Sequence, residues 1–180
     1  MRLFHLSDLH IGKRVNEFSM IEDQKYILER ILDLAEKEMP DGVILAGDIY
    51  DKQIPSAEAV QVFDEFITKL AERKFPVFVI SGNHDSAERL AFGGRLLNSR
   101  GIYLSPVYDG TVMKIPIADQ YGTVWIHLLP FIRPAAVRRV FEDESDLITD
   151  VQSAVRAVIS HMEIDPNERN ILVAHQFVTG

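Results

Sequence analysis

The sequence predicts an α/β fold built around a mainly parallel sheet. Over the first 80 residues, apolar runs typical of strands alternate with amphipathic stretches typical of helices. Such alternation is typical of right-handed crossovers, which place neighbouring strands parallel to one another. With 180 residues, 47% of them hydrophobic, the chain has enough apolar material for one core. We therefore expect a single domain over residues 1–180.

The first elements follow from their hydrophobic patterns. An opening apolar run ends at Leu6 and predicts a strand. Apolar residues then recur at helical spacing over 20–39, and Pro40 ends that helix. The apolar run 43–46 is short and rich in strand-forming residues, and it predicts a second strand.

A second helix and a third strand complete the N-terminal part. Ser56 is suited to cap the N-terminus of this helix. We expect five of the helix side chains to point inward, namely Val60, Phe63, Phe66, Ile67 and Leu70. The apolar run 76–80 then predicts a strand parallel to the first two.

After Gly101 the pattern changes to short runs separated by proline and glycine. Short strands are predicted at 102–104, 112–117 and 123–129, and we expect them to form an antiparallel meander. Helical periodicity follows over 134–141 and 146–162. A last strand, 170–174, ends directly before His175.

The composition restricts the chemistry. The chain has no cysteine, which excludes disulfides, thiolate zinc sites and cysteine nucleophiles and favours an intracellular setting, so we expect a cytoplasmic protein. Acidic residues outnumber basic ones by 27 to 19, and the formal charge of −8 disfavours broad adhesion to nucleic acid. Metal ions or a partner would have to supply positive charge to any bound polyanion. No apolar run is long enough to span a membrane.

Polar clusters follow four of the predicted strands. Because the carboxyl ends of parallel strands meet at one edge of a sheet, where α/β proteins bind ligands, we expect these side chains to converge. The clusters are Asp8 with His10, Asp48 with Asp51, Asn83 with His84 and Asp85, and His175.

Together these clusters can hold two divalent cations. Such a pair needs a bridging carboxylate surrounded by His, Asp and Asn ligands. In an extended segment Asp8 and His10 would point to the same side. Asp48 is the natural bridge, because Gly47 lets the backbone approach the site closely. Asn83 offers a neutral oxygen to the second ion.

His84 is left free to contact a substrate. Its imidazole can stabilise charge that develops on phosphorus or protonate a leaving oxygen. Asp51 and Asp85 are expected behind the ligands, where they orient imidazole rings or hold a loop. Water activated between the two ions would attack the phosphorus.

Each motif alone is weak, because an Asp two residues before a His, or a Gly-Asp pair, often occurs by chance. The ordered combination is far more specific. His5, His127 and His161 are better explained as packed or solvent-facing side chains. Exposed basic residues are commonly only solvated, yet four near the proposed site can contact phosphates: Lys13, Arg14, Lys52 and Arg89.

These residues resemble the calcineurin-like metallophosphoesterase superfamily. The motifs that carry the resemblance are Asp8-x-His10, Gly47-Asp48-x-x-Asp51, Gly82-Asn83-His84-Asp85 and His175. Within that superfamily, segments 5–13 and 47–56 are similar to the SbcD-type nuclease subunits. The resemblance implies a four-layered α/β/β/α sandwich with two divalent metal ions, expected to be Mn²⁺, with Mg²⁺ as the alternative.

The resemblance also implies a function. It implies a DNA exonuclease and endonuclease that acts on DNA ends and hairpins in break repair and recombination. An SbcC-like coiled-coil ATPase is the implied partner, and a homodimer is the implied assembly. Matching positions imply that one ion is held by Asp8, His10 and Asp48, and the other by Asp48, Asn83 and His175. His84 is the implied catalytic imidazole.

The pattern departs from the superfamily at the end. Its last motif, Gly-His-x-His, is not found in the 180 residues, and neither is the capping domain of the SbcD family. We therefore expect a C-terminally incomplete domain in which each ion lacks one protein ligand. Two alternatives stay open: another metallophosphoesterase acting on a small nucleotide or lipid, and a scaffold that binds metal weakly. A phosphatase is less favoured, because Lys52-Gln53 stands where phosphatases usually carry Arg-Gly.

Overall fold

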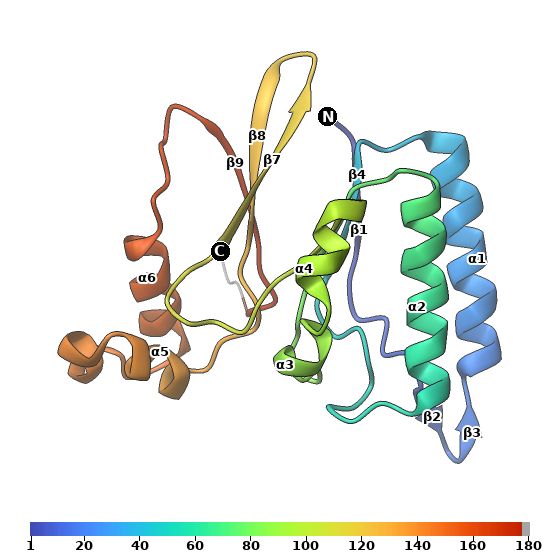
Figure 1. The fold of residues 1–180 in the computed structure, drawn as a ribbon. Coiled ribbons are helices and arrows are strands. Elements are labelled where there is room, and N and C mark those ends of the chain that lie inside the picture. Colours follow the sequence, from blue (N-terminus) through green and yellow to red (C-terminus); the bar gives the residue numbers. More distant parts are fainter. Residues whose placement is uncertain (178–180) are drawn as a thin grey trace.

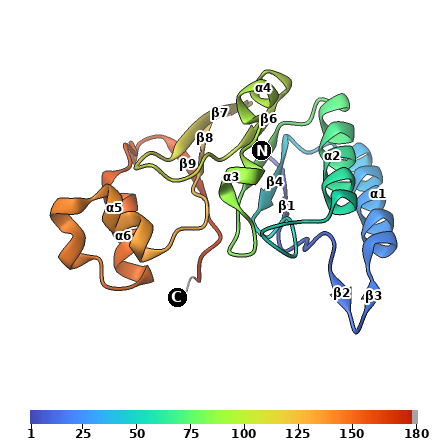
Figure 2. The ribbon, with the colours of Figure 1, turned by 60° about the horizontal axis from the view of Figure 1, so that its bottom comes forward.

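The computed structural model describes residues 1–177, and its elements form four layers (Figure 1). Two long helices cover one sheet, a second sheet packs against the first, and two further helices lie beyond it. Figure 2 shows the same layers from another direction. The four-layered α/β sandwich expected from the sequence is therefore confirmed.

The first sheet is entirely parallel. Its strands lie in the order β1 (Leu3–Leu6), β4 (Gly42–Ala46), β5 (Val77–Ile80) and β6 (Ile102–Leu104). Helices α1 (Ile21–Glu38) and α2 (Ala57–Glu72) cover its outer face. The side chains of Val43, Leu45, Val77 and Val79 point toward these helices and join them in one hydrophobic core.

The second sheet packs on the other face of the first. It consists of β7 (Met113–Asp119), β8 (Gly122–Leu128) and β9 (Arg169–Val173). Ile44 and Phe78 of the first sheet pack against Ile126 and Leu128 of the second. Helices α5 (Pro134–Val140) and α6 (Val151–His161) lie on its far side (Figure 1).

Short elements connect these layers. They are the hairpin β2 (Arg14–Val15) and β3 (Phe18–Ser19), the helices α3 (Ala87–Leu90) and α4 (Gly94–Leu97), and the 3₁₀ helices η1 (Asn98–Arg100) and η2 (Glu142–Leu147). None of the helices in the described part of the chain is long and apolar enough to cross a membrane.

The prediction of an antiparallel meander after Gly101 was wrong in two places. Among the described strands after Gly101, only β7 and β8 pair antiparallel, through the tight turn at Asp119–Gly122. Strand β6 extends the first sheet parallel to β5. Strand β9 is parallel to β8, because α5 and α6 form a crossover between them.

Two details of the helices also differ from the predictions. Val60 is 44% exposed, whereas Val62 is buried, because the inner stripe of α2 runs from Ala59 at helical spacing. The helix expected over 146–162 begins only at Val151. Asp150 and Ser153 form a capping box there, and the residues before it adopt the 3₁₀ helix η2. The predicted cap of α2 is confirmed, since Ser56 Oγ accepts the Ala59 N–H at 3.2 Å.

Candidate metal centre

The polar clusters that follow the strands meet in one cleft of about 490 Å³. It lies at the carboxyl ends of β1, β4, β5 and β9, as expected for an α/β sheet. All five predicted metal ligands and the predicted catalytic histidine line it, namely Asp8, His10, Asp48, Asn83, His84 and His175.

Three of these residues hold an unusual backbone conformation. Asp8, His10 and Asp48 have φ angles of 56°, 43° and 50°, in the left-handed region. The expectation of an extended Asp8–His10 segment was therefore wrong, because the chain turns tightly after β1. Hydrogen bonds from His10 N–H to the Asp48 carbonyl (2.9 Å) and from Asp8 N–H to the Gly47 carbonyl (3.2 Å) hold the two turns side by side. Such strain, about 1–3 kcal/mol per residue, is commonly kept at functional sites.

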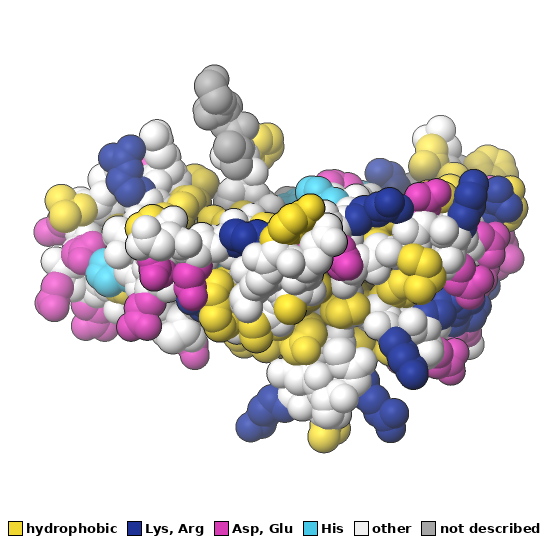
Figure 3. Space-filling model, turned by 90° about the horizontal axis from the view of Figure 1, so that it is seen from above, with side chains coloured by type: hydrophobic (Ala, Val, Ile, Leu, Met, Phe, Trp, Pro, Cys, Tyr) yellow, Lys and Arg dark blue, Asp and Glu magenta, His cyan; other side chains and the backbone are white. Residues whose placement is uncertain are grey.

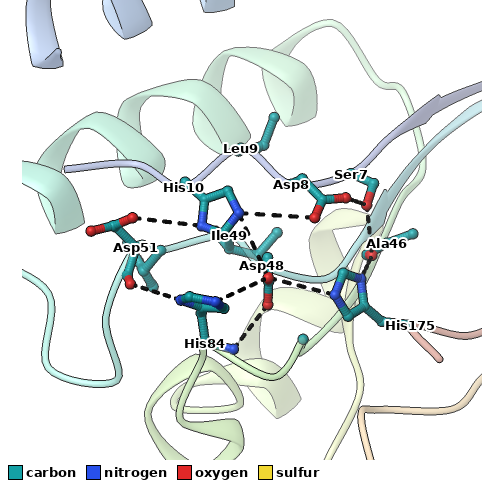
Figure 4. Close-up of polar contacts among 12 residues, drawn as sticks. Ser7, Asp8, Leu9, His10, Ala46, Asp48, Ile49, Asp51, His84 and His175 are labelled. Carbon is teal, nitrogen blue, oxygen red and sulfur yellow. Dashed lines mark hydrogen bonds and ion pairs between the residues drawn. The ribbon is translucent and has the colours of Figure 1, made fainter. Parts of the chain in front are cut away.

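Asp48 lies at the centre of the cluster, with only 3% of its surface exposed. One carboxylate oxygen, Oδ2, faces three imidazole nitrogens (Figure 4). It lies 3.6 Å from Nε2 of His175, 3.7 Å from Nε2 of His10 and 4.0 Å from Nε2 of His84. The other oxygen accepts the backbone N–H of His84 at 2.9 Å. A carboxylate oxygen that is surrounded by several other possible ligand atoms is well placed to be shared between two metal ions.

The possible ligands fall into two groups that share Asp48. Ligand atoms of His10, Asp48 and His84 lie within 4.8 Å of one another, as do those of Asp8, Asp48 and His175. Nε2 of His10 also lies 3.9 Å from Oδ1 of Asp8, so the two groups adjoin and the placement of Asp8 with His10 at one ion stays a prediction. Asn83 is exposed in the same cleft.

Backbone carbonyls orient two of the three rings. His175 donates from Nδ1 to the Ala46 carbonyl at 2.7 Å, and His84 Nδ1 lies 3.1 Å from the Asp51 carbonyl. These bonds place the proton on Nδ1 and turn each Nε2 toward Asp48, which is how acceptors behind a metal site prepare its histidines. His10 differs, because its buried Nδ1 has no hydrogen bond and its nearest carboxylate oxygen, on Asp51, is 3.7 Å away.

Asp85 holds the loops together and contacts no imidazole in a hydrogen bond. Its buried carboxylate accepts three backbone N–H groups, from Gly82 at 2.8 Å, Tyr50 at 2.9 Å and Ile49 at 3.1 Å. The loop after β5 is thereby joined to the loop after β4. Burial, and then the Asp85 charge, raise the pKa of the Tyr50 hydroxyl above its usual range, so it stays neutral.

The glycines and the donor set fit divalent cations. A Cβ at Gly82 would overlap the carboxylate of Asp48, and one at Gly47, where φ is +86°, would lie 2.6 Å from the His175 ring. Among residues 1–177, the only groups within ion-pair distance of Asp48 are histidines. A buried carboxylate of this kind is costly without a cation. Carboxylates and imidazoles together suit divalent metal ions.

Comparison with known proteins agrees with this geometry. A family model described as calcineurin-like phosphoesterase matches residues 1–179. The chain belongs to this phosphoesterase family. Members of this family are hydrolases that bind divalent metal ions. The His and Asp cluster of this chain supplies possible ligands for such ions.

The phosphoesterase chain is also homologous to the SbcD component of SbcCD nucleases. It is 36% identical to the SbcD component of the nuclease SbcCD from Staphylococcus epidermidis and 34% identical to its counterpart from Staphylococcus saprophyticus. Both matches cover 100% of this chain and 47% of the relative, so the chain spans about half the length of these relatives. A solved structure of the Escherichia coli phosphoesterase Yfce matches with 15% identity over 71% of this chain and 56% of that chain, at a TM-score of 0.35. A similarity of this size does not establish a shared fold or function.

Gln24 is a site residue of this phosphoesterase that the sequence reading missed. Its side-chain amide donates to the carbonyls of His10 (2.8 Å) and Leu9 (3.1 Å), and its oxygen accepts the Gly12 N–H at 2.9 Å. It therefore fixes the turn that carries His10. The signal was present, because Gln24 lies one turn before Leu28 on the apolar stripe of α1, where a polar residue is unexpected.

The other three histidines, His5, His127 and His161, do not belong to the two groups of possible metal ligands. His127 is buried and pairs with the Asn170 side chain at 2.9 Å. His161 stacks on Phe141 at 4.1 Å between ring centroids. His127 is thus a packed side chain and His161 a solvent-facing one, the two outcomes predicted for these histidines. His5 is solvent-facing as expected, but it lines the metal cleft, which the sequence did not indicate.

The basic residues predicted to contact phosphate lie outside the metal cleft. Arg14 and Lys52 line a neighbouring cleft of about 370 Å³ that meets the site at Asp51. Lys13 and Arg89 are exposed. A long phosphate backbone that follows the surface could meet them, whereas a small substrate held at the metals would not.

Proposed function

We propose that this chain carries the active site of an SbcD-like DNA exonuclease and endonuclease, which hydrolyses phosphodiester bonds with two divalent ions. The observation that carries the proposal is the buried Asp48 oxygen, which faces His10, His84 and His175 at 3.6–4.0 Å. The substrate class is supported by the 34–36% identity to two proteins named as the SbcD component of the nuclease SbcCD.

In this proposal Asp48 would be a ligand shared by two divalent ions, Mn²⁺ with Mg²⁺ as the alternative. The remaining ligands are Asp8, His10, Asn83 and His175. When bound, the ions supply Lewis-acid activation of water and neutralise charge on the phosphate. The chain's part is to hold these ligands in a narrow cleft, through the tight turns after β1 and β4 and the Asp85 clamp.

His84 is the proposed catalytic imidazole. It is 45% exposed on its side chain, so bulk water can deliver a proton to it. Because Nδ1 is held by the Asp51 carbonyl, Nε2 is the atom that faces the cleft. A protonated Nε2 can stabilise charge on the phosphate oxygens or give its proton to the leaving oxygen. Asp51 supports this ring through its carbonyl, and its carboxylate faces His10.

Digestion of DNA by the full gene product tests the proposal. We expect Mn²⁺-dependent cleavage of linear duplex and hairpin DNA, abolished in Asp48→Asn. The matched control is Asp143→Asn, which changes an exposed carboxylate on η2. Cleavage of phosphomonoesters with no cleavage of DNA would contradict the proposal.

A phosphodiesterase acting on a small nucleotide is the second candidate. It is favoured by the formal charge of −8 and by the absence of the four predicted basic contacts from the described lining of the metal cleft. Figure 3 shows basic side chains scattered among acidic ones on the face it presents. A panel of cyclic and linear dinucleotides beside duplex DNA separates the two candidates. A weakly metal-binding scaffold is distinguished by metal stoichiometry.

Partners belong to the same proposal. An SbcC-like ATPase is the proposed partner and would supply positive charge that this acidic chain lacks. The two relatives are named as the D component of the nuclease SbcCD. Dimerisation is supported by exposed apolar side chains around α4, because Phe92, in the turn before this helix, is 87% exposed and Leu96, on the helix, is 80% exposed. Charged substitutions at both positions should shift a dimer to a monomer in analytical ultracentrifugation.

One phosphoesterase domain over 1–180 and a cytoplasmic location also remain predictions.

A further inference from the structure

Besides the cleft lined by Arg14 and Lys52, a second cleft, of about 340 Å³, adjoins the metal cleft. Asn83 and Phe131 line both, so the two clefts are direct neighbours. A volume of this size is typical of pockets for small ligands or for one unit of a larger ligand. A molecule in the second cleft would therefore touch the metal site at one end.

Phe131 and Arg133 share one wall of the second cleft, on a segment held firmly from both sides. The Phe131 N–H donates to the Ser81 carbonyl at 2.8 Å, directly before the loop that carries Asn83. Ile132 between them is buried, with 2% exposed. Pro134 keeps Arg133 extended, at φ −114° and ψ 147°. Because alternate residues of an extended segment face the same way, both side chains are turned to the cleft.

The two side chains also lie close to each other. The guanidinium carbon of Arg133 lies 5.9 Å from the centroid of the Phe131 ring, at the outer limit of a cation–π contact. Phe131 is partly exposed and Arg133 is exposed. The wall thus offers an aromatic face and a positive charge side by side, and neither group is used in holding the metals.

Glu88 lines the same cleft and carries the opposite charge. Its carboxylate accepts the Ser86 hydroxyl at 2.9 Å, and its backbone and Ser86 hydrogen bonds lower the pKa of Glu88, so it is ionised at neutral pH. A phosphate in this cleft is therefore repelled by Glu88 and attracted by Arg133. An anionic ligand with a flat ring has one favourable orientation.

We infer that Phe131 and Arg133 form a nucleotide subsite beside the metal centre, an inference that rests on the proposed function. The base next to the scissile phosphate stacks on Phe131, and the following phosphate pairs with Arg133. Stacking tolerates every base, because each has a flat π-face. The subsite therefore positions a strand without selecting its sequence.

Equilibrium binding tests the subsite without any reaction. Fluorescence anisotropy of labelled phosphorothioate tetrathymidylate with the full gene product is measured in Mn²⁺, because the sulfur substitution keeps the charge of the strand and resists cleavage. We expect Phe131→Ala to raise Kd about 10-fold and Phe131→Trp to restore binding. Arg133→Ala should also weaken binding and make it less dependent on salt. The matched controls, Tyr121→Ala in the β7–β8 turn and Arg139→Ala on α5, should bind as the wild type does.

Two results of this experiment would overturn the inference. They are a wild-type protein that does not bind the strand, and Phe131→Ala binding that equals wild type. Folding of each variant is checked by circular dichroism, and Phe131→Trp keeps the aromatic face where the alanine variant is unstable.

Hydrolysis of two matched esters separates this inference from the proposed function. Methyl p-nitrophenyl phosphate and thymidine 5′-(p-nitrophenyl phosphate) share a leaving group, but only the second carries a nucleoside. We expect Phe131→Ala to lower kcat/KM for the nucleoside ester about 10-fold, mainly through KM, and to lower that for the methyl ester much less. Equal losses on both esters would contradict the subsite. Absence of Mn²⁺-dependent hydrolysis in wild type would contradict the proposed function, while the anisotropy result still decides the subsite.

Discussion

Nδ1 of His175 lies 2.7 Å from the carbonyl oxygen of Ala46, although 129 positions separate the two residues in sequence. The contact joins the end of β9 in the second sheet to the end of β4 in the first. It places a proton on Nδ1 and leaves Nε2 facing Asp48 at 3.6 Å. The two sheets therefore have to pack correctly before the metal site is complete.

Replacing His175 should remove one of two bound ions. In His175→Ala the ion proposed to be held by Asp48, Asn83 and His175 loses its only nitrogen ligand, whereas the ion proposed to be held by Asp8, His10 and Asp48 keeps every ligand. We expect Mn²⁺ stoichiometry, measured by isothermal titration calorimetry, to fall from two to one per chain. His161→Ala, which removes a histidine on α6, should leave it at two. Unchanged stoichiometry in His175→Ala would show that this histidine is not a ligand.

Gly82→Ala should disrupt the metal site. The added Cβ would overlap the backbone nitrogen and carboxylate of Asp48, which is itself buried and cannot move freely. We expect Mn²⁺ affinity to fall at least about 10-fold, as it does when groups that support metal ligands are displaced. In the control Gly94→Ala the new Cβ would lie 3.5 Å from Leu104, an ordinary contact. Calorimetry should therefore show wild-type affinity there, and weakened binding in both variants would contradict the steric argument.

Asp85→Asn should destabilise the fold. The buried carboxylate accepts three backbone N–H groups. An Asn side chain keeps one accepting oxygen, but its NH₂ group cannot accept, so at least one of these N–H groups loses its partner. We expect the free energy of unfolding in urea to fall by about 3 kcal/mol, because charge-assisted bonds are lost and buried donors are left unpaired. Asp143→Asn should change it little, since exposed substitutions usually have small effects. A loss below about 1 kcal/mol in Asp85→Asn would contradict the clamp.

Acid should weaken the contact between Asp119 and Arg169. The two side chains form a bidentate ion pair at 2.7 and 2.8 Å, and this pairing lowers the pKa of the Asp119 carboxyl well below its usual range. A lowered pKa in the folded state means that the stabilisation is present at pH values above the ordinary value of about 4, and is lost as pH falls below it.

The sign of the effect can be checked with Asp119→Asn. This variant should unfold at lower urea concentrations than wild type at pH 7, and the difference should shrink as pH is lowered from about 4 toward 2. A difference that stays constant over this range would mean that the ion pair does not stabilise the fold. Arg139→Ala, far from this pair on α5, serves as the control.

The convergence of the site could be predicted from sequence because parallel strands end at the same edge. Asp8, Asp48 and Asn83 each follow an apolar run, so their meeting required only the sheet topology. The predictions failed where a conformation depends on contacts distant in sequence. The left-handed turn at His10 is held by Asp48 and Gln24, and neither contact is visible in the local pattern.

The pairing of the last strands was also beyond local pattern. Short runs of alternating residues look alike in parallel and antiparallel sheets, so β9 could not be assigned a direction from its own residues. Its direction follows from the crossover through α5 and α6. The start of α6 was predictable, since Asp150 and Ser153 form a capping box that the hydrophobic spacing alone obscured.

The proposed function depends most on Asp48, which we propose bridges two ions. Electron paramagnetic resonance of Mn²⁺ bound to this chain tests it most directly, because two ions that share a carboxylate couple magnetically and isolated ions do not. We predict a coupled two-ion spectrum at two Mn²⁺ per chain, and its complete loss in Asp48→Asn with the fold intact by circular dichroism. Two uncoupled ions, or a coupled spectrum that survives in Asp48→Asn, would contradict the account.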